Sequence, residues 1–79
     1  MTKLKNPHPG EILFYEFILP RNLSIEALSE NIGLIPGQIA SLVNGNIKIT
    51  SDIDKDLSRF FGTSEGFWLG LQKDYDDHT

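Results

Sequence analysis

The chain has 79 residues, no cysteine and a formal net charge of −4 at pH 7. Hydrophobic residues make up 39% of it, enough for one modest core and too much for a disordered tail. The lack of cysteine excludes disulfides and thiolate metal sites. The first nine residues have no apolar segment of the kind found in signal peptides, and no apolar run is long enough to cross a membrane. We therefore expect a cytoplasmic protein that forms a single domain over residues 1–79.

The acidic residues gather toward the C-terminal end. Residues 64–79 carry one lysine against four carboxylates, a net charge of −3, and residues 24–45 carry two glutamates and no lysine or arginine. A negative net charge is unusual for a nucleic-acid binder, because much of DNA affinity comes from cations. An acidic end suits a basic protein partner as well as it suits solubility.

The first predicted helix runs from about Pro9 to Leu19. A proline suits its first helical position, and Pro20 ends it. Apolar side chains lie on more than one face of this helix. Phe14 and Tyr15 therefore either pack beneath a neighbouring helix or contact another protein, and the sequence leaves both possibilities open.

The second predicted helix begins after Ser24, which is a good N-cap. It ends at Gly33, where we expect a backbone conformation with positive φ. The third predicted helix starts near Pro36 and ends at Asn44-Gly45. Its apolar face has helical spacing and consists of Ile39, Leu42 and Val43.

Two more helices complete the prediction. Thr50 or Ser51 caps the fourth, with Ser51 and Asp54 at capping-box spacing, and Gly62 ends it. Its expected core stripe is Ile53, Leu57, Phe60 and Phe61. Ser64 opens the fifth, whose apolar side is formed by Phe67, Trp68, Leu71 and Tyr75. No segment shows the alternation of a strand, so the predicted fold class is all-α with five helices.

The most informative unit spans residues 24–45. A helix-turn-helix needs a small residue where its two helices cross, a glycine in the turn and apolar anchors on the second helix. Ser29 and Gly33 meet the first two needs. The facing apolar residues are Leu28, Ile32, Ile39 and Leu42. A generic αα-hairpin would share most of these residues, but all of them at these offsets within a five-helix chain favour a helix-turn-helix.

In such a motif the N-terminal part of the second helix enters the major groove of DNA. We expect the outward side chains of Pro36, Gly37, Gln38, Ala40 and Ser41 to face the bases. Gln38 is the best candidate, because its amide can pair with adenine N6 and N7. Asn44 and Lys48 are placed to contact phosphates. The alternative for each polar residue is a solvated side chain without a ligand.

With these residues in hand, the chain resembles the HigA (VapI-like) antitoxin family, within the lambda-repressor and Cro-like (XRE) helix-turn-helix group. The resemblance covers nearly the whole length. It includes His8-Pro9-Gly10-Glu11 and Val43-Asn44-Gly45. The most specific part is the closing run Arg59-Phe60-Phe61-Gly62-Thr63-Ser64, followed by Phe67-Trp68-Leu69 and Leu71-Gln72.

The resemblance implies a function. Such antitoxins neutralise a small basic toxin, an RNA-cleaving protein of the HigB type, and as homodimers they repress their own operon by binding a palindromic operator. The C-terminal helix, about residues 64–75, is where such proteins commonly dimerise. The resemblance therefore makes Trp68, Leu71 and Tyr75 candidate dimer contacts. Phe14 and Tyr15, which replace what is usually a charged pair in the family, stay candidate partner contacts because of the apolar faces of the first helix.

The chain departs from the family pattern where DNA would be read. Ile35-Pro36-Gly37 stands where members usually have Ser followed by Arg or another polar residue, so the N-cap serine of the second motif helix is missing. No lysine or arginine lies between Asn22 and Ile47. We therefore expect DNA binding to be weak, or to depend on Lys3, Lys5, Lys48 and a partner.

Two other classes of function are considered. The same fold could serve as a protein-interaction module in which DNA recognition is weakened or lost. An enzyme is disfavoured, because His8 and His78 lie far apart in the sequence without metal-ligand companions. Asp52, Asp54 and Asp56 are spread around a helix and are expected to form a solvated face. We expect neither a cofactor nor a metal.

Overall fold

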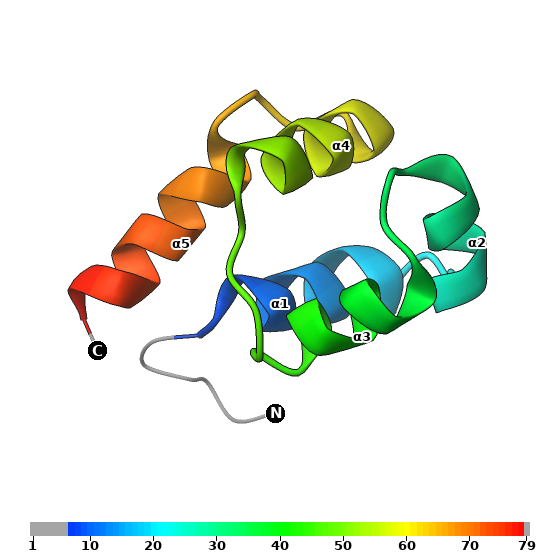
Figure 1. Cartoon of the computed structure of the whole chain (residues 1–79), viewed down its shortest axis with the longest axis horizontal. Coiled ribbons are helices and arrows are strands. Elements are labelled where there is room, and N and C mark those ends of the chain that lie inside the picture. The colour runs from blue at the N-terminus through cyan, green and yellow to red at the C-terminus, as the bar shows by residue number, and fades with distance from the viewer. Residues whose placement is uncertain (1–6, 79) are drawn as a thin grey trace.

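The computed structural model describes residues 7–78, in which helices follow one another without a strand. The first helix has two parts, α1 (Pro9–Ile12) and the π-helical η1 (Leu13–Ile18). The others are α2 (Ile25–Asn31), α3 (Pro36–Val43), α4 (Ser51–Phe61) and α5 (Phe67–Asp77). In Figure 1, α3 lies beside the first helix, with α4 above these two helices and α5 to their left. The predicted all-α, five-helix fold is confirmed.

The wide winding of η1 was not predicted. The Leu19 N–H donates to the Phe14 carbonyl at 2.8 Å, a step of five residues where an α-helix has four. The Leu23 N–H likewise donates to the Ile18 carbonyl at 3.1 Å. An apolar periodicity predicts a helix here, but it does not distinguish α from π winding over six residues.

The core lies where α1, η1, α2, α3, α4 and α5 meet. Its fully buried large side chains are Leu13, Leu28, Ile39, Leu42, Leu57 and Trp68. Phe17, at the edge of this core, packs its ring 4.9 Å from that of Trp68 and 5.1 Å from that of Phe61. Phe60 was expected in the core stripe of α4, but it is 36% exposed and contacts Phe61 edge-on, so that expectation is wrong.

His8 and the residues after it form a reciprocal cap at the start of the first helix. His8 Nδ1 accepts from the Gly10 N–H, and Glu11 Oε1 accepts from the His8 N–H, both at 2.9 Å. Pro9 occupies the first helical position, where its missing N–H has no consequence. Two otherwise unpaired backbone donors are thus satisfied in a partly buried place.

Gly10 lies where the first helix packs closely against α3. A Cβ at this position would lie 1.7 Å from the Leu42 carbonyl oxygen and 3.0 Å from the Val43 Cα. Only a residue without a side chain lets the first helix pack against the last turn of α3. Position 10 therefore requires glycine because α3 leaves no space for a side chain there. Backbone conformation is not the reason, since Gly10 does not have positive φ.

The N-cap of α4 is one of the two residues expected there, whereas the capping of α5 differs from the expectation. Thr50 is the N-cap of α4, and its Oγ1 accepts from the Ile53 N–H at 3.3 Å. Asp54 does not complete a capping box with Ser51; it is 1% exposed and points at α5. The expected solvated face is therefore wrong for Asp54. The fifth helix begins at Phe67 instead of Ser64, after Gly66 with φ of 93°.

Asp54 supplies the acceptors at the start of α5. Its Oδ2 accepts from the Gly66 N–H at 2.7 Å, and its Oδ1 accepts from the N–H groups of Trp68 at 2.9 Å and Leu69 at 3.3 Å. A carboxylate at a helix N-terminus also meets the positive end of the helix dipole. A side chain from α4 therefore replaces a local N-cap for α5.

We predict that Gly10→Ala lowers the free energy of unfolding by about 3 kcal/mol, because the added methyl forces the first helix away from α3. Gly70→Ala is the matched control, since a Cβ there meets nothing within 4 Å. Within α5 this control should be stabilising by about 0.5–1 kcal/mol. Urea unfolding followed by circular dichroism measures both. Equal stability of Gly10→Ala and the wild type would contradict the close packing.

Candidate nucleic-acid interface

α2 and α3 form a helix-turn-helix whose crossing is held by a small side chain. Ser29 Oγ donates to the Leu34 carbonyl at 2.8 Å, so the residue expected at the crossing also closes the turn. Leu28 and Ile39 face each other across the crossing and are fully buried. The turn is thus fixed both by packing and by a hydrogen bond.

Gly33 has a different role from the expected one. It is not among the glycines with positive φ, and α2 ends at Ile32 in an extended conformation. A Cβ on Gly33 would lie 3.1 Å from Asp56 Oδ2. The Asp56 side chain on α4 thus lies close beside Gly33, and the predicted left-handed conformation is wrong here. At Gly45 and Gly62 the expected positive φ is present, 80° and 76°.

The N-terminal end of α3 receives no hydrogen bond from the side chain of its N-cap residue, as the missing serine indicated. Ile35 is the N-cap and has no polar side-chain atom. Gln38 Oε1 instead accepts from the Ile35 N–H at 3.0 Å. This hydrogen bond ties the Gln38 carbonyl oxygen to the backbone and leaves its NH₂ group as the part of the amide available for donation.

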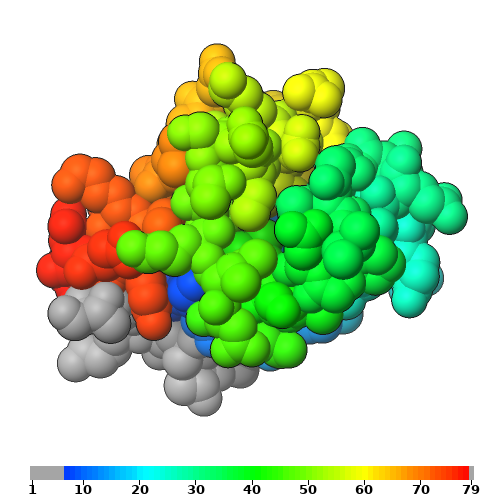
Figure 2. All heavy atoms as spheres, viewed as in Figure 1, coloured from blue at the N-terminus to red at the C-terminus, as the bar shows by residue number. Residues whose placement is uncertain are grey.

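The residues proposed to face bases lie on one surface, and their exposure decreases along α3. Pro36, Gly37 and Gln38 are exposed, whereas Ala40 and Ser41 are half-buried. Figure 2 shows α3 and the loop after it on one open face of the molecule, between α2 and α5. The structure therefore brings the predicted base-facing residues together, although Gln38 also serves as a cap.

The loop that follows α3 is held by α5. Lys48 Nζ lies 3.4 Å from Asp76 Oδ2, and the Ile49 N–H donates to the buried Gln72 Oε1 at 2.8 Å. Gln72 Nε2 donates in turn to Asp76 Oδ1 at 3.1 Å. Lys48, expected to contact phosphate, therefore already has an anionic partner. Asn44 is exposed, and Lys3 and Lys5 lie outside the described residues.

His8 connects the first helix to this loop. Its ring hydrogen-bonds to the backbone of Ile47 and packs edge-on against Tyr75 at 4.9 Å between ring centroids. Because Nδ1 accepts from Gly10, the neutral ring carries its proton on Nε2. Burial lowers the pKa of His8 below its ordinary 6.5, and the carboxylates of Glu11 and Asp76 offset part of that change.

The residues proposed as dimer and partner contacts differ in how deeply they are buried. Trp68 is fully buried and has no surface to offer another chain, so it is removed from that set; it belongs to the core, and its Nε1–H donates to Thr63 Oγ1 at 3.1 Å. Tyr15 is 50% exposed. Phe14, Leu71 and Tyr75 are half-buried.

The sequence analysis assigned no buried role to the four buried polar residues, which are His8, Asp54, Ser58 and Gln72. A signal was present for Asp54, because Asp54 and Ser58 continue the buried stripe of Ile53 and Leu57 on α4. Their polar character drew attention away from that spacing. Gln72 gave a similar signal, because it lies four residues after the buried Trp68 on α5. Its partner Ile49, however, is 23 residues away in the sequence.

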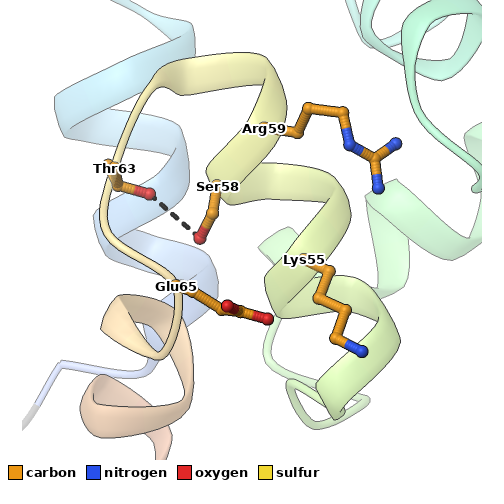
Figure 3. A pocket seen from close by; sticks show the side chains of 5 residues that line it. All are labelled: Lys55, Ser58, Arg59, Thr63 and Glu65. Carbon is orange, nitrogen blue, oxygen red and sulfur yellow. Dashed lines mark hydrogen bonds between the residues drawn. The ribbon is translucent and has the colours of Figure 1, made fainter.

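A shallow pocket lies between α4 and the segment before α5 (Figure 3). Ser58 Oγ donates to the Ser64 carbonyl at 3.0 Å, and Thr63 Oγ1 donates to Ser58 Oγ at 3.2 Å. Lys55 and Arg59 lie at its rim with Glu65. Since both hydroxyl protons are already donated within the protein, the pocket floor is structural.

Residues 7–78 were also considered for a metal site and for a membrane-spanning helix. No three His, Cys, Asp or Glu side chains are grouped so as to hold a metal ion. No helix in the same range has the length and apolar character needed to cross a membrane.

Comparisons with known proteins identify the family. Virulence-associated protein I of Dichelobacter nodosus is 39% identical over 69 residues, 87% of this chain and 64% of that protein. Antitoxin HigA-1 of Vibrio cholerae is 31% identical over 71 residues, 90% of this chain and 67% of that protein. The chain belongs to the HigA (VapI-like) antitoxin family. The resemblance drawn from the sequence is confirmed, although no family model matches the chain.

A solved structure of a HigA protein has the same fold. Pseudomonas aeruginosa antitoxin HigA with the higBA promoter matches with a TM-score of 0.88 at 32% identity, covering 94% of this chain and 80% of that chain. The chain spans less than two thirds of the first curated relatives that it matches, 57% for the Escherichia coli regulator YbaQ and 64% for virulence-associated protein I.

We predict that acid weakens the fold through His8. Its folded pKa is lowered below 6.5, so in the window just below 6.5 the unfolded chain binds more protons than the folded chain. The stability contributed by the neutral ring is complete above pH 6.5 and is lost as the pH falls toward the folded pKa.

His8→Asn tests this, because asparagine keeps an N-cap acceptor and does not titrate. Urea unfolding of both proteins between about pH 7.5 and pH 5 should show a steeper loss of stability for the wild type. Parallel pH profiles for the two proteins would contradict the role given to His8.

Proposed function

We propose that this chain is a HigA-type antitoxin that represses its own operon by binding a palindromic operator as a homodimer. In the same proposal it neutralises a small basic, RNA-cleaving toxin of the HigB type in the cytoplasm. It acts by binding and has no catalytic role. The observation that carries the proposal is the exposed N-terminal half of α3 on a helix-turn-helix that matches HigA bound to its promoter.

The geometry supports the DNA-binding part through α3. Its first turn carries exposed residues, and its last turn is anchored to the first helix at Gly10. A helix held in this way presents its N-terminus to the major groove as one rigid body. Two copies related by a twofold axis would read half-sites about 34 Å apart, one turn of DNA.

The charge distribution supports the toxin-binding part. Asp74, Asp76 and Asp77 are exposed near the C-terminal end of α5. A basic protein would be attracted to this end and steered toward it. The partly exposed Tyr15 and half-buried Phe14 offer the apolar area that such a contact needs.

A second candidate function rests on a specific observation. Residues 23–46 hold no lysine or arginine, and the nearest following cation, Lys48, is paired with Asp76. A chain with so few free cations beside α3 could serve as a protein-interaction module of the same fold, with DNA binding weakened or lost.

One experiment distinguishes the two functions. Fluorescence anisotropy compares binding to labelled DNA from upstream of the chain's own gene with binding to a scrambled duplex, over a series of salt concentrations. The proposal expects tighter binding to the upstream DNA, weakening as salt increases. Equal and feeble binding to both duplexes would reject the repressor and favour the interaction module.

We predict that Asp76→Asn strengthens binding to the upstream DNA about threefold more than Asp77→Asn does, since it frees Lys48 for phosphate. The two variants are matched, because each removes one charge from α5, and Asp77 pairs with Lys73 at 3.1 Å, whereas Asp76 pairs with Lys48. Anisotropy at low salt measures the ratio. An equal gain in both variants would assign the effect to net charge and not to Lys48.

A further inference from the structure

We infer that the start of α3 recognises thymine in the operator half-site, by packing the thymine C5-methyl group against Ile35 and donating from Gln38 to the neighbouring O4. The inference rests on the proposed function and specifies which base edge the surface takes. It assigns base recognition to an apolar side chain at the position before Pro36.

Ile35 is the most exposed large hydrophobic residue among those that the structure describes, at 63%. Its backbone is held in place: its N–H donates to Gln38 Oε1 at 3.0 Å, and its carbonyl accepts from the N–H groups of Gln38 at 3.0 Å and Ile39 at 3.2 Å. The fold therefore fixes an isoleucine at the tip of the helix without burying it. Packing within the chain does not explain this placement.

The surroundings of Ile35 allow a base edge to come close. Pro36 and Gly37 are exposed, and a Cβ added to Gly37 would meet nothing within 4 Å. Proline has no N–H to donate, so the first turn of α3 offers bases an apolar surface with little hydrogen-bonding capacity of its own. Among the residues of this turn, Gln38 alone has a polar side chain.

Gln38 can supply a donor beside that apolar surface. Its carbonyl oxygen already accepts from Ile35, so the NH₂ group is the part of this exposed amide that is left to donate. In the major groove, thymine presents the O4 acceptor next to the C5-methyl group, which is the one apolar group among the base edges there. A donor and an apolar side chain held three residues apart on one helical turn match this pair of groups.

The experiment removes the methyl group and nothing else. Each thymine of the upstream DNA is replaced in turn by deoxyuridine, which keeps O4, and binding is measured by anisotropy. For the wild type we expect one or two positions in each half-site where the replacement weakens binding about fourfold. For Ile35→Ala we expect weaker binding overall and no further loss at those positions. Ile35→Val should retain most of the methyl dependence.

Leu19→Ala is the control, since Leu19 is an apolar side chain of similar exposure, 57%, outside the helix-turn-helix. It should leave the deoxyuridine effects unchanged. Because Ile35 is mostly exposed, its truncation should leave the fold intact, which circular dichroism checks directly.

The outcomes separate this inference from the function on which it rests. Preferential binding to the upstream DNA without any Ile35-dependent methyl effect would overturn the inference and leave the repressor standing. Methyl effects that persist in Ile35→Ala would also overturn it, because another residue would then read the methyl group. Absence of any preference for the upstream DNA would overturn both, and a role for Ile35 in contacting protein would then replace it.

Discussion

The position of α3 depends on the contact between Gly10 and the Leu42 carbonyl, because no side chain fits between the two helices there. Each residue of His8-Pro9-Gly10-Glu11 contributes to this contact. His8 and Glu11 satisfy the backbone donors that the close packing would otherwise leave unpaired, and Pro9 begins the helix without a donor. Because the same contact fixes the last turn of α3, the exposed first turn of α3 has a defined orientation relative to the first helix.

A second set of contacts couples α5 to the surface beside α3. Asp54 holds the N-terminus of α5 with three backbone hydrogen bonds, and Gln72 holds the loop after α3 through the Ile49 N–H. Buried polar groups of this kind are stabilising only when all their partners are in place. The position of α5 therefore helps to set the position of Lys48 and Ile49 in the loop after α3.

The sequence was sufficient to predict the structural features that depend on local patterns. It was insufficient for features that depend on contacts between residues far apart in the chain. The five helices, the crossing at Ser29 and the stops at Gly45 and Gly62 followed from spacing and turn chemistry, and the structure agrees. Gly33 was misinterpreted, because the sequence does not show that the residue capping the end of α2, Ile32, is extended and that the chain continues without positive φ. The cap of α5 was misplaced to Ser64 because its acceptor comes from α4. The pairing of Lys48 with Asp76 likewise joins residues that no local pattern connects.

We propose that this chain reads DNA with the first turn of α3, using apolar contact at Ile35 and a hydrogen-bond donor at Gln38. The most direct measurement is a ¹⁵N NMR titration of the protein with its upstream DNA, following each backbone amide. The account predicts that the largest shifts fall on residues 35–41 and 44–48, with small changes along η1. Shifts confined to η1 and α5, or no shifts at all, would contradict it and would make protein binding the function of this fold.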